Sequence, residues 1–327
     1  MIPSSRTTTI DARLLRLLKE SKNRFLSGEE LSGELGITRS AVWKHIEGLR
    51  DLGFKIRALP HEGYQYLSSP DRLFAEEIKA MLKTDLIGQE ILTFKTIDST
   101  NRLATEMGEK GAREGLVIFS EEQTRGKGRL GRHWASPEGK GLYFSILLRP
   151  ILDIGVVAKL TLMAAVSAAE VLQEKGLNRV GIRWPNDIVL GEKKIGGILT
   201  EMSAESDRLN FVVSGIGLNV HKAPRLPPGG ISLEDATGKR WDRLSLALHL
   251  LASIERNYLL LKKGEDNSLA RRWEFFSTVS GKRVRATTLK ETLSGTALGI
   301  DSNGALWIRE ESGIQKRLLA GDITLLR

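Results

Sequence analysis

The segment LVIFSEEQTRGKGRLGRHWASPEGKGLYFSILL, residues 116–148, decides the fold of the middle of the chain. Its centre, GKGRLG at 126–131, satisfies the glycine spacing G-x-G-x-x-G of dinucleotide-binding proteins. In those proteins the glycines follow a strand and open a helix, whose N-terminus holds the pyrophosphate. Here Pro137, Gly139 and Gly141 follow the glycines, and the chain then reads as another strand rather than a helix. The segment therefore predicts strand–loop–strand, and the dinucleotide interpretation fails.

The loop between these strands is rich in positive charge, with Arg125, Lys127, Arg129 and Arg132 in nine residues. Such a loop can wrap an anion with its side chains and backbone N–H groups, and its glycines permit close approach. A solvated basic loop and an RNA contact are alternatives that the loop alone leaves open. The P-loop pattern G-x-x-x-x-G-K-[ST] does not occur.

Two nearby segments favour a ligand site. RWPND at 183–187 places a stiff Trp–Pro turn ahead of Asn186 and Asp187, so that polar groups are held in fixed geometry. KKIGG at 193–197 places Lys194 before two glycines in a strand, which is typical of close backbone approach. Alone, Trp184 would be a core residue and Lys194 a solvated one; together with the basic loop they indicate a binding site.

Composition limits the class of protein. The 327 residues suffice for two or three domains, and 41% apolar and 27% charged residues are ordinary for a globular chain. The absence of cysteine excludes disulfides, thiolate metal sites and cysteine nucleophiles. We find no signal-peptide pattern and no apolar run long enough to span a membrane, so we expect a cytoplasmic protein without a membrane partner. The net charge of +9 is spread evenly along the chain and is weak evidence for nucleic acid.

Residues 1–70 predict a DNA-binding unit. Ser27 and Glu30 form a capping box for a helix that ends at the turn residue Gly36, and a third helix follows from Thr38. Alternating residues 54–67 predict a β-hairpin, so the unit reads as a winged helix-turn-helix. The polar side chains that open the third helix are the expected DNA contacts: Arg39, Ser40 and Lys44. The alternative is a small helical domain that docks on an enzyme and touches no DNA.

The rest of the chain divides near residue 276. Residues 71–275 mix helices and strands, and the segment 157–176 is apolar almost all round, which predicts a buried helix. Residues 276–327 are short strands separated by Gly, Ser and Asn-Gly turns, which predict a small antiparallel barrel. The fold class is therefore multidomain α+β.

Several motifs in one order carry a resemblance to a known family: Asp98–Asn101, Gln123 with 126–132, 183–187, Lys194 with Gly197, and Gly215–Asn219. The middle of the chain resembles biotin–protein ligases, and with the N-terminal unit it resembles the bifunctional bacterial form that also represses the biotin operon. The resemblance implies a central mixed sheet like that of class II aminoacyl-tRNA synthetases and an SH3-like C-terminal barrel. Lys127 departs from the usual Gly-Arg-Gly-Arg pattern. Lysine keeps the charge and loses the planar fork, so we expect looser retention of the bound intermediate.

The resemblance also implies the reaction. Biotin and ATP form biotinyl-5′-AMP and pyrophosphate, with Mg²⁺ on the ATP phosphates. A lysine of the biotin carboxyl carrier protein of acetyl-CoA carboxylase then takes the biotinyl group, and AMP leaves. Both steps depend mainly on positioning and electrostatic stabilisation.

Residue roles follow from the same resemblance, each by its place in a matching motif. The catalytic residues are Arg129, Lys194 and Asp187. The biotin-binding residues are Ser99, Thr100, Asn101, Gln123, Lys127, Gly128, Arg129 and Lys194. The nucleotide-binding residues are Arg129, Arg132, Asn186, Lys194 and Asn219, although a strand-end turn is the alternative for Asn219. No protein ligand set for a metal is assigned.

In family members with this N-terminal unit, bound biotinyl-AMP promotes a homodimer that binds operator DNA. We expect any order change on ligand binding in residues 125–132 and 221–230. Three other functions remain: a lipoate–protein ligase, a biotin-sensing regulator with weak catalysis, and an RNA-binding protein.

Overall fold

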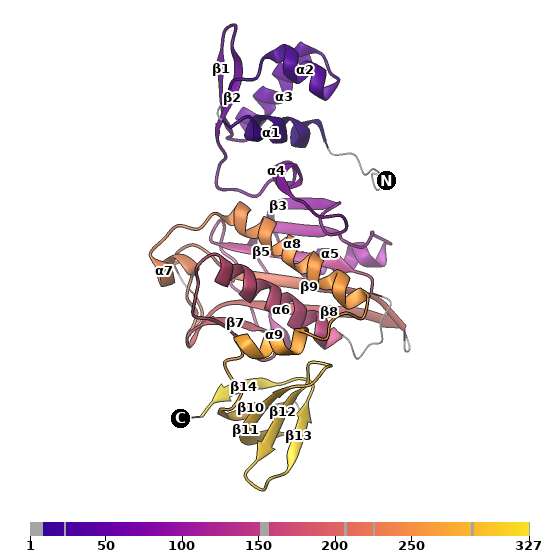
Figure 1. Cartoon of the computed structure of the whole chain (residues 1–327), viewed down its shortest axis with the longest axis vertical. Coiled ribbons are helices and arrows are strands. Elements are labelled where there is room, and N and C mark those ends of the chain that lie inside the picture. The colour runs from indigo at the N-terminus through magenta and orange to yellow at the C-terminus, as the bar shows by residue number, and fades with distance from the viewer. Residues whose placement is uncertain are drawn as a thin grey trace. The chain divides into compact units, whose positions relative to one another are not determined.

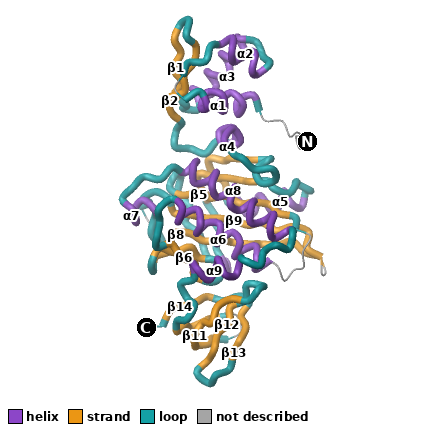
Figure 2. The backbone as a smooth tube through the Cα atoms, viewed as in Figure 1, coloured by secondary structure: helices purple, strands orange, loops and turns teal. Residues whose placement is uncertain are grey.

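The computed structural model describes residues 9–22, 24–150, 157–205, 208–224, 226–288 and 291–326. They form two compact units, Met1–Lys83 and Thr84–Arg327. Figure 1 traces the chain through both units, and Figure 2 separates their helices from strands and loops.

The first unit begins with the predicted winged helix-turn-helix. Side-chain caps open all three helices, and the capping box of Ser27 and Glu30 is present in full. Gly36 ends the second helix in the left-handed conformation, as the turn prediction requires. The elements are α1 (Ile10–Glu20), α2 (Gly28–Leu35), α3 (Arg39–Asp51), β1 (Lys55–Leu59) and β2 (Gly63–Ser68).

The hairpin is fixed to the helices by backbone pairing. Leu26, between α1 and α2, donates its N–H to the Tyr64 carbonyl at 2.9 Å and accepts from the Tyr64 N–H at 2.8 Å. A Cβ on Gly63 would lie 2.1 Å from the Leu26 carbonyl oxygen, and its φ is +110°. Only glycine satisfies both conditions, so this position sets how closely the hairpin approaches.

A fourth helix, α4 (Ala75–Met81), belongs to the same unit. Phe74 and Ala80 join the core cluster that holds the leucines of α1, and the buried carboxylate of Glu77 forms an ion pair with Lys19. The first unit therefore extends to Lys83, past the boundary predicted at residue 70. The hairpin is followed by a helix that packs back on α1, and that packing is a tertiary contact.

The second unit is built on a mixed seven-stranded sheet of order β3-β4-β5-β9-β8-β7-β6. Only β3 and β4 pair in parallel, and every other neighbouring pair is antiparallel. The mixed sheet confirms the predicted fold class, although the edge strand β3 was not predicted. The strands are β3 (Ile91–Ile97), β4 (Val117–Gln123), β5 (Gly141–Leu148), β6 (Val180–Arg183), β7 (Asp187–Leu190), β8 (Lys193–Glu205) and β9 (Arg208–Asn219).

Helices cover the sheet. Ala104 of α5 packs with Ile118, Leu147 and Val213 of three neighbouring strands. Figure 1 shows α6 and α8 side by side across the sheet, and α6 is buried along most of its length, as predicted. The helices are α5 (Thr100–Glu109), α6 (Val157–Glu174), α7 (Leu233–Thr237), α8 (Arg243–Lys262) and α9 (Leu269–Phe276).

The end of the chain forms a second, antiparallel sheet of order β13-β12-β11-β10-β14. The predicted small antiparallel domain is confirmed, and β11 alternates buried and exposed residues as a half-buried strand should. The indole N–H of Trp184, in the turn between β6 and β7, donates to the Gly304 carbonyl at 3.1 Å and connects the two sheets. The strands are β10 (Arg283–Thr287), β11 (Thr292–Ile300), β12 (Leu306–Glu310), β13 (Gln315–Leu318) and β14 (Asp322–Leu325).

Candidate functional site

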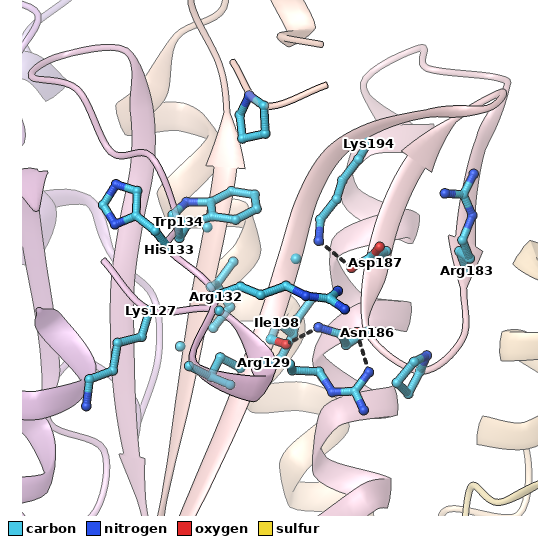
Figure 3. Close-up of a pocket in the computed structure, with 18 of the residues that line it drawn as sticks. Lys127, Arg129, Arg132, His133, Trp134, Arg183, Asn186, Asp187, Lys194 and Ile198 are labelled. Carbon is cyan, nitrogen blue, oxygen red and sulfur yellow. Dashed lines mark hydrogen bonds and ion pairs between the residues drawn. The ribbon is translucent and has the colours of Figure 1, made fainter. Parts of the chain in front are cut away.

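A cavity of about 570 Å³ opens in the second unit, where the basic loop meets the sheet. Its lining comes from the start of α5, the loop after β4, the β6–β7 turn, the start of β8, the middle of β9 and the start of β14. The structure brings together these predicted site residues: Ser99, Thr100, Asn101, Gln123, Lys127, Gly128, Arg129, Arg132, Asn186, Asp187 and Lys194. Figure 3 shows how the charged members of this set lie.

Lys194 stands at the beginning of β8 and faces a carboxylate. Its Nζ lies 2.6 Å from Oδ1 of Asp187, and the two side chains point toward each other in Figure 3. A β-bulge between β7 and β8 falls at this point, since Ile188 pairs with Gly196 and Val189 with Lys194. Bulges commonly re-aim side chains beside functional sites. The ion pair leaves one positive and one negative group together at the cavity.

The Arg129 side chain is less exposed than those of Lys194 and Arg132. Its Nη1 donates to the Gly321 carbonyl at 3.0 Å and to Oδ1 of Asn186 at 3.4 Å, and it lies 3.6 Å from Oδ1 of Asp322. Burial lowers the pKa of the Arg129 guanidinium, and the carboxylates of Asp322 and Asp187 act in the opposite direction. An anionic ligand would favour the charged form of Arg129, as these carboxylates do, because it would add negative charge beside a partly desolvated cation.

Backbone hydrogen bonds hold the loop that carries Arg129. Arg125 donates its N–H to the Asp98 carbonyl at 2.8 Å, and Gly128 donates to the Arg132 carbonyl at 2.7 Å. The Lys127 side chain is exposed and points away from Arg129 and its neighbours in Figure 3. Lys127, which replaces the arginine of the Gly-Arg-Gly-Arg pattern, therefore points away from Arg129.

A second group of lining residues, around Gln123, is hydrogen-bonded. Oε1 of Gln123 accepts from the N–H and the hydroxyl of Thr100 at 2.9 and 3.1 Å, and its Nε2 donates to Oγ of Ser136 at 2.9 Å. The Ser145 hydroxyl lies 2.7 Å from Oγ1 of Thr100 and 2.6 Å from Oδ1 of Asn101. These bonds fix the side-chain orientations, so this group presents a preformed set of donors and acceptors.

Glycines of β9 let side chains approach the sheet. A Cβ on Gly215 would lie 2.0 Å from Oδ1 of Asn101, and a Cβ on Gly217 would lie 2.6 Å from Nε1 of Trp134. The Trp134 ring lies 5.3 Å, centroid to Nζ, from Lys194. Its indole N–H is buried and has no hydrogen-bond partner within the described ranges, which is the condition of a donor that faces a ligand acceptor. We did not predict Trp134; its place directly after the basic loop was the available signal.

Two other parts of the lining were missed or only partly recognised. Residues 227–229 pair with the start of β8, since the Lys194 N–H donates to the Gly229 carbonyl at 2.8 Å and the Ile231 N–H to the Lys194 carbonyl at 2.9 Å. We predicted an order change on ligand binding in 221–230 but not the pairing of this segment with β8, and residue 225 lies outside the described residues. Asp322 forms ion pairs with Arg129 and Arg132 from the C-terminal sheet. Nothing near Asp322 in the sequence pointed to this contact.

Asn219 lies apart from the other predicted nucleotide ligands. It does not line the cavity, and its buried side chain donates to the Ile231 carbonyl at 3.4 Å at the end of β9. This placement agrees with the alternative that Asn219 finishes a strand. The DNA-binding candidates Arg39, Ser40 and Lys44 are all exposed on α3 of the first unit.

Two searches of the molecule were negative. No group of three or more histidine, aspartate and glutamate side chains placed to hold a metal ion occurs in the described part of the chain. Within the same residues, no helix has the length and apolar character needed to cross a membrane.

Comparison with known proteins agrees with this architecture. A family model described as "Biotin/lipoate A/B protein ligase family" matches residues 93–219, one described as "HTH domain" matches 12–65, and one described as "Biotin protein ligase C terminal domain" matches 279–326. The bifunctional ligase/repressor BirA of Bacillus subtilis (strain 168) is 37% identical over 97% of this chain and 99% of its own length. BirA of Escherichia coli (strain K12) is 32% identical over 97% of each chain. A biotin protein ligase from Aquifex aeolicus, solved in complex with biotin and ATP, superposes with a TM-score of 0.63 at 30% identity, over 73% of this chain and 99% of that one.

Proposed function

The chain belongs to the biotin/lipoate A/B protein ligase family, and on this premise we propose how its cavity performs the reaction. It is an ATP-dependent biotin–protein ligase of the bifunctional ligase/repressor type. One observation carries the residue assignment: one cavity is lined both by Arg129, Asn186, Asp187 and Lys194 and by the hydrogen-bonded network around Gln123. A polar, uncharged ureido ring suits the network around Gln123, and the carboxylate and phosphates suit the charged residues.

In the first step the biotin carboxylate attacks the α-phosphate of ATP, and pyrophosphate leaves. Two anions must approach each other, so their mutual repulsion is the main electrostatic barrier. Lys194 and Arg129 are proposed to neutralise the carboxylate and the α-phosphate. Asn186 holds Arg129 at 3.4 Å and donates from its Nδ2 to the Ile198 carbonyl at 2.8 Å, which keeps the guanidinium in place before substrates arrive. Arg132 is proposed to contact the nucleotide.

In the second step a lysine amine of the carrier protein attacks the mixed anhydride, and AMP leaves. Asp187 is the carboxylate paired with Lys194, and we propose that it guides the incoming amine. The donor set also suits Mg²⁺, which binds through one or two carboxylates together with substrate phosphates. Asp187 would hold such an ion, whose charge would offset that of the ATP phosphates. Lys194 would still neutralise the biotin carboxylate.

Biotin adenylation is the direct test of this activity. Incubating the protein with ATP, Mg²⁺ and labelled biotin should yield labelled biotinyl-AMP, and adding a biotin carboxyl carrier domain should transfer the label to that domain. Lipoate supplied instead of biotin should give neither product, because the hydrogen-bonding groups around Thr100 and Gln123 would be left unpaired by a dithiolane ring. Adenylation of lipoate at a comparable rate would favour the lipoate–protein ligase alternative. Label retained as adenylate without transfer would favour the regulator with weak catalysis.

For the repressor function we propose a homodimer that forms when biotinyl-AMP is bound and then binds operator DNA. The ligand would act by favouring the dimer-competent state, which requires different affinities for the two states. The segments around the cavity are suitable for such coupling, since 227–229 and the basic loop both line it. We propose three functional parts: the DNA-binding unit, the catalytic part to residue 275, and the part 276–327. We place the protein in the cytoplasm, where ATP, carrier protein and operator DNA meet.

Replacing Arg39 with alanine should weaken operator binding about 10-fold while ligation continues at the wild-type rate, because one exposed phosphate contact is lost from α3. A gel shift with biotin, ATP and Mg²⁺ present measures it. Arg16→Ala, also exposed in the same unit but on α1, is the matched control and should bind as wild type does. Equal affinity for all three proteins would remove Arg39 from the DNA contacts.

A further inference from the structure

The exposed face of α3 carries a large aromatic residue between its polar side chains. Val42, Ile46 and Leu49 are buried in the core of the first unit. Trp43 lies on the other face, one turn after Arg39, and is 54% exposed. All six tryptophans lie in the described ranges, and Trp43 is the most exposed of them.

That exposure calls for a partner. A tryptophan side chain gains more than most from leaving water, and an exposed indole on a helix face is typical of binding surfaces. The indole N–H of Trp43 has no hydrogen-bond partner among the described residues, so the ring is not held by a polar contact inside the unit. The core of the unit forms without it.

The charges around Trp43 indicate the chemistry of the partner. Arg39 precedes it by one turn and Lys44 follows it directly, both exposed. The acidic side chain one turn later, Glu47, forms an ion pair with Arg50 at 2.6 Å. The N-terminal half of α3 is therefore positive around an apolar ring, whereas its C-terminal half carries the Glu47–Arg50 pair and the exposed carboxylate of Asp51. A polyanion with apolar groups between its charges fits this face.

Double-stranded DNA presents those groups in its major groove, where phosphates line the rim and thymine C5-methyl groups project from the floor. In helix-turn-helix proteins the N-terminal residues of the second helix reach the base edges. We propose that Trp43 packs against thymine methyl groups of the operator and is a specificity-determining residue of the repressor. This inference rests on the proposed repressor function. Arg39 and Lys44 would hold phosphates without reading sequence, whereas Trp43 would read it.

The test needs a DNA duplex of defined sequence. Wild-type protein is first used to enrich such duplexes from a random-sequence pool, with biotin, ATP and Mg²⁺ present. The enriched duplex is then prepared with uracil in place of single thymines, which removes a methyl group and keeps the base pairing. Trp43→Ala should bind the thymine duplex about 10- to 100-fold more weakly than wild type does, the range for a lost base contact. Wild type should lose a similar factor on one uracil duplex, and the variant should lose nothing further there.

Two additional variants sharpen the result. Trp43→Phe keeps a flat apolar ring and should stay within about threefold of wild type. Leu52→Ala removes a 45%-exposed apolar side chain from the other end of α3 and should not change binding. The slope of affinity against salt should remain unchanged in Trp43→Ala and decrease in Arg39→Ala, because only the second loses a phosphate contact. Circular dichroism of each variant checks that the unit stays folded.

The inference is overturned if Trp43→Ala binds the enriched duplex as tightly as wild type does. It is also overturned if replacing thymine with uracil weakens binding by Trp43→Ala as much as it weakens binding by wild type. It is equally overturned if Trp43→Phe is as weak as Trp43→Ala, or if Trp43→Ala changes only the monomer–dimer equilibrium in sedimentation. Failure of wild type to enrich any duplex would defeat the repressor function as well. Enrichment by wild type with an insensitive Trp43→Ala would defeat only the role of Trp43.

Discussion

Replacing Lys194 with alanine is expected to lower the rate of biotin-dependent pyrophosphate exchange by a hundredfold or more. Its ammonium is proposed to neutralise charge at the reacting centre, and losing such a contact typically costs about 2–4 kcal/mol. The effect should fall on kcat more than on KM, because the contact strengthens as the anions meet. Alanine keeps the backbone hydrogen bonds of Lys194 to Gly229 and Ile231, so the loop beside the cavity should stay in place.

The neighbouring lysine is the control. Lys193 opens the same strand and is exposed, and it does not line the cavity. Lys193→Ala should exchange pyrophosphate at the wild-type rate. If the Lys194 variant matched the Lys193 variant, Lys194 would have no part in adenylation, and the charged residues of the cavity would need another assignment.

Replacing Glu121 with alanine is expected to lower the free energy of unfolding of the second unit by about 3–5 kcal/mol, since it removes one partner of a buried ion pair. Oε2 of Glu121, on β4, lies 2.7 Å from Nη1 of Arg243 at the start of α8, and both side chains are almost completely buried. The variant keeps the contact of Arg243 with the Gly141 carbonyl at 3.2 Å, and leaves its charge without this carboxylate. Urea unfolding followed by tryptophan fluorescence measures the change, because every tryptophan except Trp43 lies in this unit.

Glu122 provides the comparison one residue later on the same strand. Its carboxylate accepts from the exposed Thr96 hydroxyl at 3.1 Å, so Glu122→Ala should change the free energy of unfolding by less than about 1 kcal/mol. A Glu121 variant that unfolds at the same urea concentration as the Glu122 variant would show that the buried pair does not stabilise the unit.

The C-terminal sheet contributes to the cavity as well as to its support. Asp322 at the start of β14 pairs with Arg129 and Arg132, and the Gly321 carbonyl accepts from Arg129. Trp184, in the stiff turn ahead of Asn186, is anchored on Gly304 of the same sheet. The loop cations and the turn that presents polar side chains are therefore both held from the C-terminal part of the chain.

Local rules were sufficient for much of the fold. The capping box at Ser27, the glycine turn at Gly36 and the helix start at Thr38 predicted the second and third helices of the first unit, because each depends on residues within two turns of one another. The residues after Gly131 predicted that no α-helix opens there, and the chain instead leads from a 3-10 turn at Arg129–Gly131 to the strand β5. The site residues could be recognised as a set because several short motifs kept one order.

Contacts between distant segments were decided only by the tertiary structure. The pairing of Arg132 with Asp322 joins residues far apart in sequence, and the approach of Trp134 to Gly217 depends on where a loop crosses a strand. The docking of α4 on α1 and the direction of the Lys127 side chain have the same origin. Caps, turns and periodicity are properties of neighbouring residues and can be read from the sequence. Which side chains meet across a cavity depends on how whole strands and helices pack, and no short segment contains that information.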